Sequence, residues 1–128
     1  MKIVLANGCF DILHYGHLAH LKAARAMGDK LIVVLTGDGF IGKGPGRPVF
    51  RAEHRKEMLE ALRCVDEVII SEAPTPHAII DRIRPDIYAK GAEYRGKLPE
   101  QEFVESYGGK VAFTDTIVFS STALLGWL

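Results

Sequence analysis

The spacing of apolar residues alternates along the chain between a pattern typical of buried strands and one typical of helices. Five short segments have the apolar character of buried strands, at residues 2–6, 31–35, 65–70, 86–89 and 110–113. Between them, apolar side chains recur every third or fourth position, which predicts helices at residues 17–27, 52–63, 76–83 and 100–107. A last short helix is expected at residues 120–125. Strands that alternate with helices predict an α/β fold with a five-stranded parallel sheet covered on both faces.

One connection is longer than the fold needs. Residues 36–50, TGDGFIGKGPGRPVF, form a glycine-rich loop after the second strand, and loops of this length are often functional. Parallel sheets bind ligands at the carboxyl ends of their strands, where the strand order reverses. We expect four segments to lie together at that edge: this loop, the segment after the first strand, Lys90-Gly91 and Ser120-Ser121-Thr122.

Composition limits the class of protein. The 128 residues fit one domain, residues 1–128, and equal numbers of acidic and basic residues give a net charge of zero. This balance argues against a general nucleic-acid binder. Cys9 and Cys64 lack metal-ligand spacing, so a reduced, cytoplasmic setting is expected. Apolar runs stay well short of the ~18 residues of a membrane span, so we expect no membrane partner.

The segment NGCFDILHYGH, residues 7–17, follows the first strand and carries the most suggestive chemistry. Gly8 permits a sharp turn and close approach of a ligand. His14 and His17 are three residues apart, so in a helix or tight turn they share a face. At a helix N-terminus the two imidazoles would form a clamp for phosphate. The alternatives are ordinary turn histidines, or a metal site with Asp11, although the spacing matches no common zinc pattern.

Three motifs resemble one enzyme family. GCFDILHYGH is similar to the HxGH signature of the nucleotidyltransferase superfamily, in its cytidylyltransferase-like branch. EHRK at residues 53–56, with VDEV at 65–68, resembles the second signature helix and third strand of that family. ANGCFD, GRPV at 46–49 and RPDIYAKGAEY at 84–94 resemble its heptose-phosphate adenylyltransferase domains more than its glycerol-3-phosphate cytidylyltransferases. The resemblance implies a Rossmann-like three-layer sandwich.

The resemblance also implies roles for individual residues. The catalytic residues would be His14, His17, Lys43 and Arg55. Nucleotide binding is expected at Gly8, Cys9, Phe10, Asp11, Gly16, Lys90, Gly91, Glu93, Tyr94, Ser120, Ser121 and Thr122. The acceptor would meet Asp11 and Arg47. No protein metal ligand is expected, because Mg²⁺ would arrive with the nucleoside triphosphate, held by phosphates and water.

Each role has a plainer alternative. Lys43, Arg47 and Arg55 could be solvated charges, and residues 90–94 could be a strand-end turn. Arg55 has no acidic residue three or four positions away with which to pair in its helix. His20, His54 and His77 are expected on helix surfaces. The chain departs from the family at its end, where Val118 replaces a glycine before the Ser-Ser-Thr segment.

We therefore expect a nucleotidyltransferase that moves a nucleotidyl group from a triphosphate, with ATP favoured, to a sugar phosphate such as heptose 1-phosphate. Pyrophosphate would be released. A cytidylyltransferase making a CDP-polyol from CTP and glycerol 3-phosphate is the alternative within the class. A non-catalytic nucleotide sensor and a flavodoxin-like interaction module are alternatives from other classes. The resemblance implies a homodimer.

Overall fold

The computed structural model describes residues 1–42 and 44–115. Its strands are β1 (Ile3–Gly8), β2 (Lys30–Thr36), β3 (Glu67–Ser71), β4 (Ile87–Gly91) and β5 (Lys110–Thr114). They form one sheet in the order β3-β2-β1-β4-β5, and every neighbouring pair is parallel. The expected five-stranded parallel sheet is confirmed.

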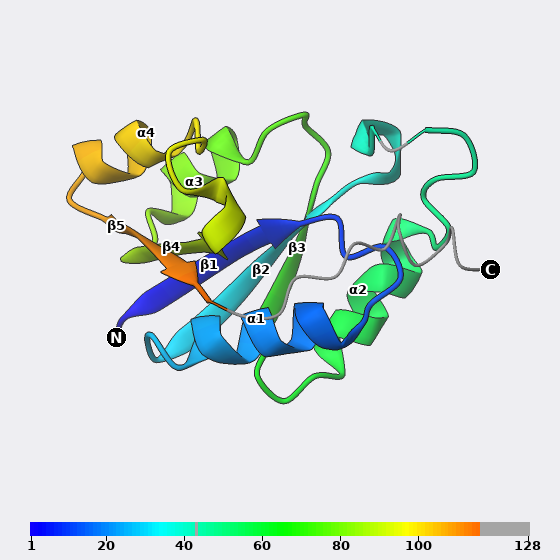
Figure 1. Ribbon diagram of the computed structural model, residues 1–128, viewed down its shortest axis with the longest axis horizontal. Coiled ribbons are helices and arrows are strands. Elements are labelled where there is room, and N and C mark those ends of the chain that lie inside the picture. The colour runs from blue at the N-terminus through cyan, green and yellow to red at the C-terminus, as the bar shows by residue number, and fades with distance from the viewer. Residues whose placement is uncertain (43, 116–128) are drawn as a thin grey trace.

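Helices cover both faces of this sheet (Figure 1). They are α1 (Tyr15–Arg25), α2 (Ala52–Glu60), α3 (His77–Ile83) and α4 (Gln101–Ser106), and two short 3-10 turns, η1 (Asp38–Phe40) and η2 (Ala92–Tyr94), follow β2 and β4. Leu21 of α1 and Leu59 of α2 belong to one apolar cluster. Ile80 of α3 and Val104 of α4 belong to a second, with Tyr88 of the sheet. The expected three-layer sandwich is therefore confirmed.

The first strand lies at the centre of the sheet. Val4 pairs with Leu31 of β2 on one side and with Ile87 of β4 on the other. The chain winds outward from β1 through β2 to β3, then crosses back to β4 and continues to β5. The winding direction thus reverses between β1 and β4. Their carboxyl ends, at Gly8 and Gly91, flank the position where folds of this kind bind ligands.

Some boundaries differ from the sequence-based expectation. β1 continues to Gly8 because Asn7 and Gly8 keep their register with β2. α1 begins at Tyr15, two residues early, because the His14 side chain caps it. α2 ends at Glu60. After it come two tighter turns, in which Leu62 N donates a hydrogen bond to Leu59 O and Val65 N donates one to Leu62 O. The helix expected at residues 120–125 lies outside the described residues.

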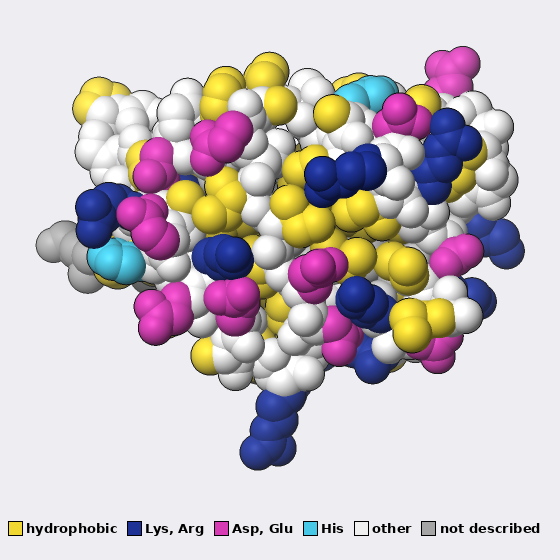
Figure 2. Space-filling view, turned by 180° about the vertical axis from the view of Figure 1, so that it is seen from behind, with side chains coloured by type: hydrophobic (Ala, Val, Ile, Leu, Met, Phe, Trp, Pro, Cys, Tyr) yellow, Lys and Arg dark blue, Asp and Glu magenta, His cyan; other side chains and the backbone are white. Residues whose placement is uncertain are grey.

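Charge is mixed over the surface. On the face seen in Figure 2, acidic and basic side chains are interspersed, with apolar side chains between them. Among the described helices, none combines the length and apolar character needed to cross a membrane.

Candidate active site

The two signature histidines form a stacked pair at the start of α1. Their ring centroids are 3.8 Å apart and the ring planes are inclined by 21°. His14 Nδ1 accepts the N–H of Gly16 at 3.1 Å, and His17 Nδ1 accepts the N–H of His14 at 3.3 Å. Since each Nδ1 is an acceptor, the proton of each neutral ring sits on Nε2. The pair therefore carries two Nε2–H donors at a helix N-terminus, where the helix dipole favours an anion, and the Nε2 of His14 is buried.

The turn before these histidines has an unusual backbone. Phe10 and Ile12 have φ angles of 49° and 65°, and left-handed values are uncommon for side chains of these kinds. Phe10 is buried and its ring meets the His17 ring edge-on, with centroids 5.2 Å apart. A Cβ at Gly8 would lie 3.0 Å from the Phe10 ring, so glycine suits the close passage of the chain. Backbone strain of this kind often marks a functional site.

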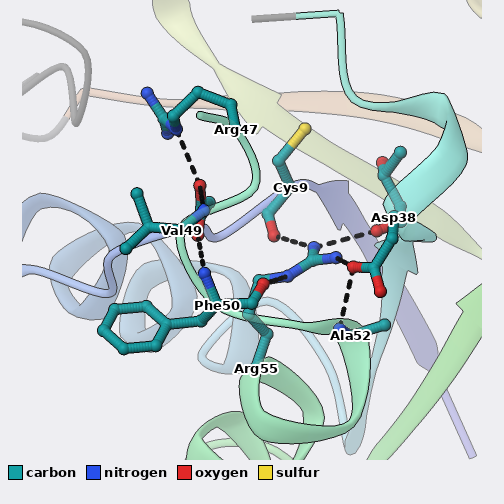
Figure 3. Close-up of polar contacts among 9 residues, drawn as sticks. Cys9, Asp38, Arg47, Val49, Phe50, Ala52 and Arg55 are labelled. Carbon is teal, nitrogen blue, oxygen red and sulfur yellow. Dashed lines mark hydrogen bonds and ion pairs between the residues drawn. The ribbon is translucent and has the colours of Figure 1, made fainter. Parts of the chain in front are cut away.

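Asp11 joins this turn to the glycine-rich loop. Its carboxylate is fully buried and accepts hydrogen bonds from Arg47 Nε at 2.7 Å, Val49 N at 2.8 Å and Phe50 N at 3.0 Å (Figure 3 shows Arg47, Val49 and Phe50). Burial alone would raise the pKa of Asp11, but the two backbone N–H groups and Arg47 outweigh it and lower the pKa. The carboxylate thus has hydrogen-bond partners within the chain, and the expected contact of Asp11 with a ligand stays a prediction.

The Arg55 side chain is buried and donates hydrogen bonds to the loops at the same edge of the sheet. It is 2% exposed. Its Nε donates to Phe50 O at 2.8 Å, and its Nη1 donates to Cys9 O at 2.7 Å and Thr36 O at 2.8 Å. Its Nη2 pairs with Asp38 Oδ1 at 2.7 Å, so the partner absent from its own helix comes from η1 (Figure 3). Its buried guanidinium joins the turn after β1 to both ends of the glycine-rich loop, and the expected contact of Arg55 with a phosphate stays a prediction.

Asp38 was missed by the sequence analysis. Its carboxylate accepts both Arg55 and the N–H of Ala52, the first residue of α2, at 2.9 Å. It therefore caps α2 from outside the helix. The available signal was its place directly after the second strand, in the run TGD.

The segment after β4 lies at the same edge of the sheet. Lys90 Nζ donates to Asn7 O at 3.3 Å and lies 4.3 Å from the centroid of the Tyr94 ring. Glu93 and Tyr94 are exposed, and Gly91 leads directly into η2. Burial lowers the pKa of Lys90, although Glu100 and Glu93 oppose this shift. The predicted nucleotide-binding segment is thus linked through Lys90 to the end of β1.

His20 is a second residue that sequence reasoning placed differently. It was expected on a helix surface, yet its Nδ1 lies 2.7 Å from Thr114 Oγ1 at the end of β5. Burial and the charge of Lys90 lower the pKa of His20, while Glu93 opposes them. The available signal was its spacing, since it stands three residues after His17 on the same helix.

An apolar cleft of about 650 Å³ adjoins the signature turn. Its apolar lining includes Phe10, Ile12, Leu13, Phe50 and Met58. The lining is mostly apolar and also includes His54, Arg55 and Glu57.

Other predicted positions fall outside this description. Lys43, Ser120, Ser121 and Thr122 lie outside the described residues. Within the described ranges, no group of three or more His, Cys, Asp or Glu side chains could hold a metal ion.

The sequence is similar to those of known proteins along most of its length. A family model described as cytidylyltransferase-like matches residues 5–119. The chain is 44% identical over 124 residues to the bifunctional protein HldE of Alcanivorax borkumensis, covering 94% of this chain and 26% of that protein. It is 42% identical over 123 residues to HldE of Syntrophotalea carbinolica, covering 94% and 25%. The chain spans about a quarter of the length of these relatives.

Two solved structures share the fold of this chain. A lipopolysaccharide core biosynthesis protein from Thermoplasma volcanium is 30% identical, with a TM-score of 0.74 over 94% of this chain and 99% of that chain. Pantothenate synthetase from Thermus thermophilus, 15% identical with a TM-score of 0.65 over 93% of this chain and 57% of that one, shares the fold. The chain belongs to the cytidylyltransferase-like family of nucleotidyltransferases.

Proposed function

We propose that this chain transfers a nucleotidyl group from a nucleoside triphosphate to a sugar phosphate and releases pyrophosphate. The observation that carries this proposal is the stacked His14–His17 pair, with both Nδ1 atoms occupied by backbone N–H groups at the N-terminus of α1. An arrangement that fixes two Nε2–H donors side by side suits a group on which negative charge develops during reaction.

The reaction needs no covalent enzyme intermediate. An oxygen of the acceptor phosphate attacks the α-phosphorus, a new P–O bond forms, and the bond from that phosphorus to the bridging oxygen breaks. The electron pair of the broken bond leaves with pyrophosphate. His14 and His17 donate to the α-phosphate and bridging oxygens as charge moves onto them. Mg²⁺ belongs to the triphosphate substrate, and its ligands would be phosphate oxygens and water.

Of the remaining residues, some contact the substrates and others hold the loops that carry these contacts. We assign triphosphate contact to Lys43, Ser120, Ser121 and Thr122, and nucleoside contact to the exposed Glu93 and Tyr94 beside Lys90 and Gly91. Gly8, Cys9, Phe10 and Gly16 shape the backbone around the phosphates. Asp11, Arg47 and Arg55 support these contacts by holding the loops, which the buried Asp11–Arg47 and Arg55–Asp38 pairs favour.

ATP and heptose 1-phosphate are the favoured substrates. This choice rests on the likeness to HldE and to a lipopolysaccharide core biosynthesis protein. CTP with glycerol 3-phosphate is the second candidate, favoured by the description of the family model as cytidylyltransferase-like. We further propose that residues 1–128 act as one catalytic domain, in the cytoplasm, as a homodimer.

Pyrophosphate release tests the proposal. Purified protein with Mg²⁺ is given ATP or CTP, each with heptose 1-phosphate or glycerol 3-phosphate, beside the variants His14→Ala and His17→Ala. His54→Ala, at an exposed histidine of α2, is the matched control. Acceptor-dependent release with one nucleotide, lost in both signature variants and kept in the control, is expected. Triphosphate binding without release from any pair would overturn the proposal in favour of a nucleotide sensor.

A further inference from the structure

The proposed reaction leaves His20 without a role, yet its side chain connects a helix to the sheet. His20 stands three residues after His17, one turn further along the helix that carries both signature histidines. Its Nδ1 lies 2.7 Å from Oγ1 of Thr114, the last residue of β5. Thr114 is 4% exposed, so solvent competes little for this hydrogen bond. The bond therefore ties α1 directly to the end of the last described strand.

The end of β5 lies at the edge of the sheet where a ligand is expected. Thr114 stands opposite Gly91 in the parallel register, at the carboxyl ends of both strands. β5 follows β4 as the outermost strand of the described sheet, so backbone pairing with β4 holds it on one side. α1 packs against β5, and Figure 1 shows the end of the strand beside this helix. A side chain of α1 can therefore fix this strand end.

Phe113 gives the strand end a second contact, on its other face. Neighbouring residues of a strand point to opposite faces of the sheet. Arg95, directly after η2, places its guanidinium carbon 4.7 Å from the centroid of the Phe113 ring. The end of β5 is therefore held between α1 and the segment that follows β4.

The position of this strand end matters for the residues that come after it. Ser120 is the first of the three hydroxyl residues to which we assign triphosphate contact, and it comes six residues after Thr114. Six residues span at most about 20 Å. The point at which the chain leaves the sheet therefore limits where these hydroxyl groups can reach.

We propose that His20 is a positioning residue, whose hydrogen bond to Thr114 fixes the end of β5 relative to α1. The hydroxyl groups that follow β5 and the signature histidines of α1 then meet the same triphosphate in a fixed relation, which is what a reaction driven by positioning requires. This role rests on the proposed function. His20 itself touches no substrate in this scheme and acts through Thr114.

A hydrogen bond elsewhere in the sheet offers a matched control. The hydroxyl of Tyr107, directly after α4, donates to Pro85 O at 2.9 Å. Pro85 precedes β4, so this bond lies at the amino edge of the sheet, away from the carboxyl ends of the strands. Tyr107→Phe removes one hydroxyl and one partly buried hydrogen bond, as Thr114→Val does, but it leaves the end of β5 unchanged.

Steady-state pyrophosphate release, with whichever of ATP and CTP is active, tests the inference. Thr114→Val removes the hydroxyl and keeps a β-branched side chain, and His20→Phe keeps an aromatic ring. Loss of one hydrogen bond is expected to raise the triphosphate KM about three- to tenfold in both variants, with the acceptor KM unchanged. Thr114→Ser keeps the hydroxyl and should retain the original KM, as should Tyr107→Phe. An unchanged triphosphate KM in Thr114→Val, or an equal rise in Tyr107→Phe, would overturn the inference.

The double variant shows whether the two residues act through each other. If His20 acts through Thr114, Thr114→Val raises the triphosphate KM of the unaltered chain but adds nothing in His20→Phe. Increases that multiply in the double variant would mean that the residues act independently, and the inference would fall. Because the two single variants break the same bond from opposite ends, either one that folds carries the kinetic test.

A measurement without nucleotide separates the inference from the proposed function. The backbone amide signals of Ser120, Ser121 and Thr122 are recorded by NMR in ¹⁵N-labelled protein. They are expected to shift in Thr114→Val and in His20→Phe, and to stay in place in Thr114→Ser and Tyr107→Phe. Shifts confined to the residues that adjoin position 114 would overturn the role of His20. If the unaltered chain releases no pyrophosphate with any substrate pair, the proposed function fails, while these signals still decide whether His20 positions the segment.

Discussion

The Asp11 carboxylate and the Arg47 guanidinium form an ion pair with 2.7 Å between Oδ2 and Nε, and the two side chains are 0% and 4% exposed. The pair joins the signature turn to the glycine-rich loop, and the same carboxylate accepts the N–H groups of Val49 and Phe50. Because both charges are out of water, the attraction between them is weakly screened by solvent. The position of one loop is therefore set by a side chain of the other.

Asp11→Asn tests how much this pair stabilises the fold. The variant keeps the size of the side chain but removes the negative charge that pairs with the buried Arg47 guanidinium. We expect the free energy of unfolding to fall by about 3–5 kcal/mol, measured by urea denaturation. Asp81→Asn is the control, since its pair with Arg84 is exposed and should change stability by less than about 1 kcal/mol. Equal losses in the two variants would contradict the structural role of Asp11.

The Asp11–Arg47 pair also predicts that the free energy of unfolding depends on pH in the acidic range. The pKa of Asp11 is lowered in the folded chain, so its stabilisation is fully present above the unfolded pKa of about 4. It is lost as the pH falls through the lowered folded value. The difference in unfolding free energy between the unaltered chain and Asp11→Asn should therefore be constant from about pH 5 to 7 and shrink below about pH 4. A difference that does not change with pH would argue against this linkage.

Arg55→Lys tests the guanidinium at the junction of the loops. Lysine keeps the charge but cannot supply the planar set of donors that reaches Phe50 O, Cys9 O and Asp38. Buried acceptors left without donors should lower the unfolding free energy by about 2–4 kcal/mol in thermal or urea denaturation. Arg51→Lys, at an exposed neighbour, should have almost no effect. A stable Arg55→Lys protein that no longer binds triphosphate would instead indicate that Arg55 contacts phosphate directly.

The two tasks of His14 can be separated. The Oδ1 of asparagine can stand in for Nδ1 and accept the Gly16 N–H, but asparagine has no counterpart of the Nε2–H donor. His14→Asn should therefore keep the cap of α1, while His14→Ala should lose about 1 kcal/mol of stability. Both variants should lose pyrophosphate release. Activity retained in His14→Asn would show that the cap, and not the donor, is what the reaction needs.

His20 should make the fold sensitive to mildly acidic pH. Its pKa is lowered in the folded chain, first by burial and then by Lys90. Its stabilisation is present above the unfolded pKa of about 6.5 and is lost as the pH falls through the lower folded value. The unfolding free energy should drop between pH 7 and pH 5, and His20→Asn should reduce that drop. Thermal denaturation at each pH measures it, and an unchanged drop in the variant would exclude His20 as the cause.

The fold was predictable because its signals are local. The run LIVVL at residues 31–35 and the apolar spacing within α1 identify a buried strand and a covering helix without reference to the rest of the chain. The pairing of His14 and His17 was also predictable, since three residues in a helical turn place both side chains on one face.

The roles of the buried charges were not predictable in the same way. Asp11 and Arg47 are 36 residues apart, and Asp38 and Arg55 are 17 apart, so neither pairing follows from a helical or strand period. Sequence reasoning placed Asp11, Arg47 and Arg55 at this edge of the sheet but assigned their charges to ligands, and it did not single out Asp38. Glu100 carries no motif, and its burial depends on how the segment before α4 packs.

The central place of β1 bears on how the chain emerges during synthesis. The first strand obtains its β2 neighbour within the first 36 residues, but its other edge pairs only with residues 87–89 of β4. Asp86 also supplies the acceptor for the Ile3 N–H, at 2.8 Å. Until that distant segment has left the ribosome, one side of the earliest strand stays open to other chains. The segment that forms β4 therefore protects β1 from aggregation.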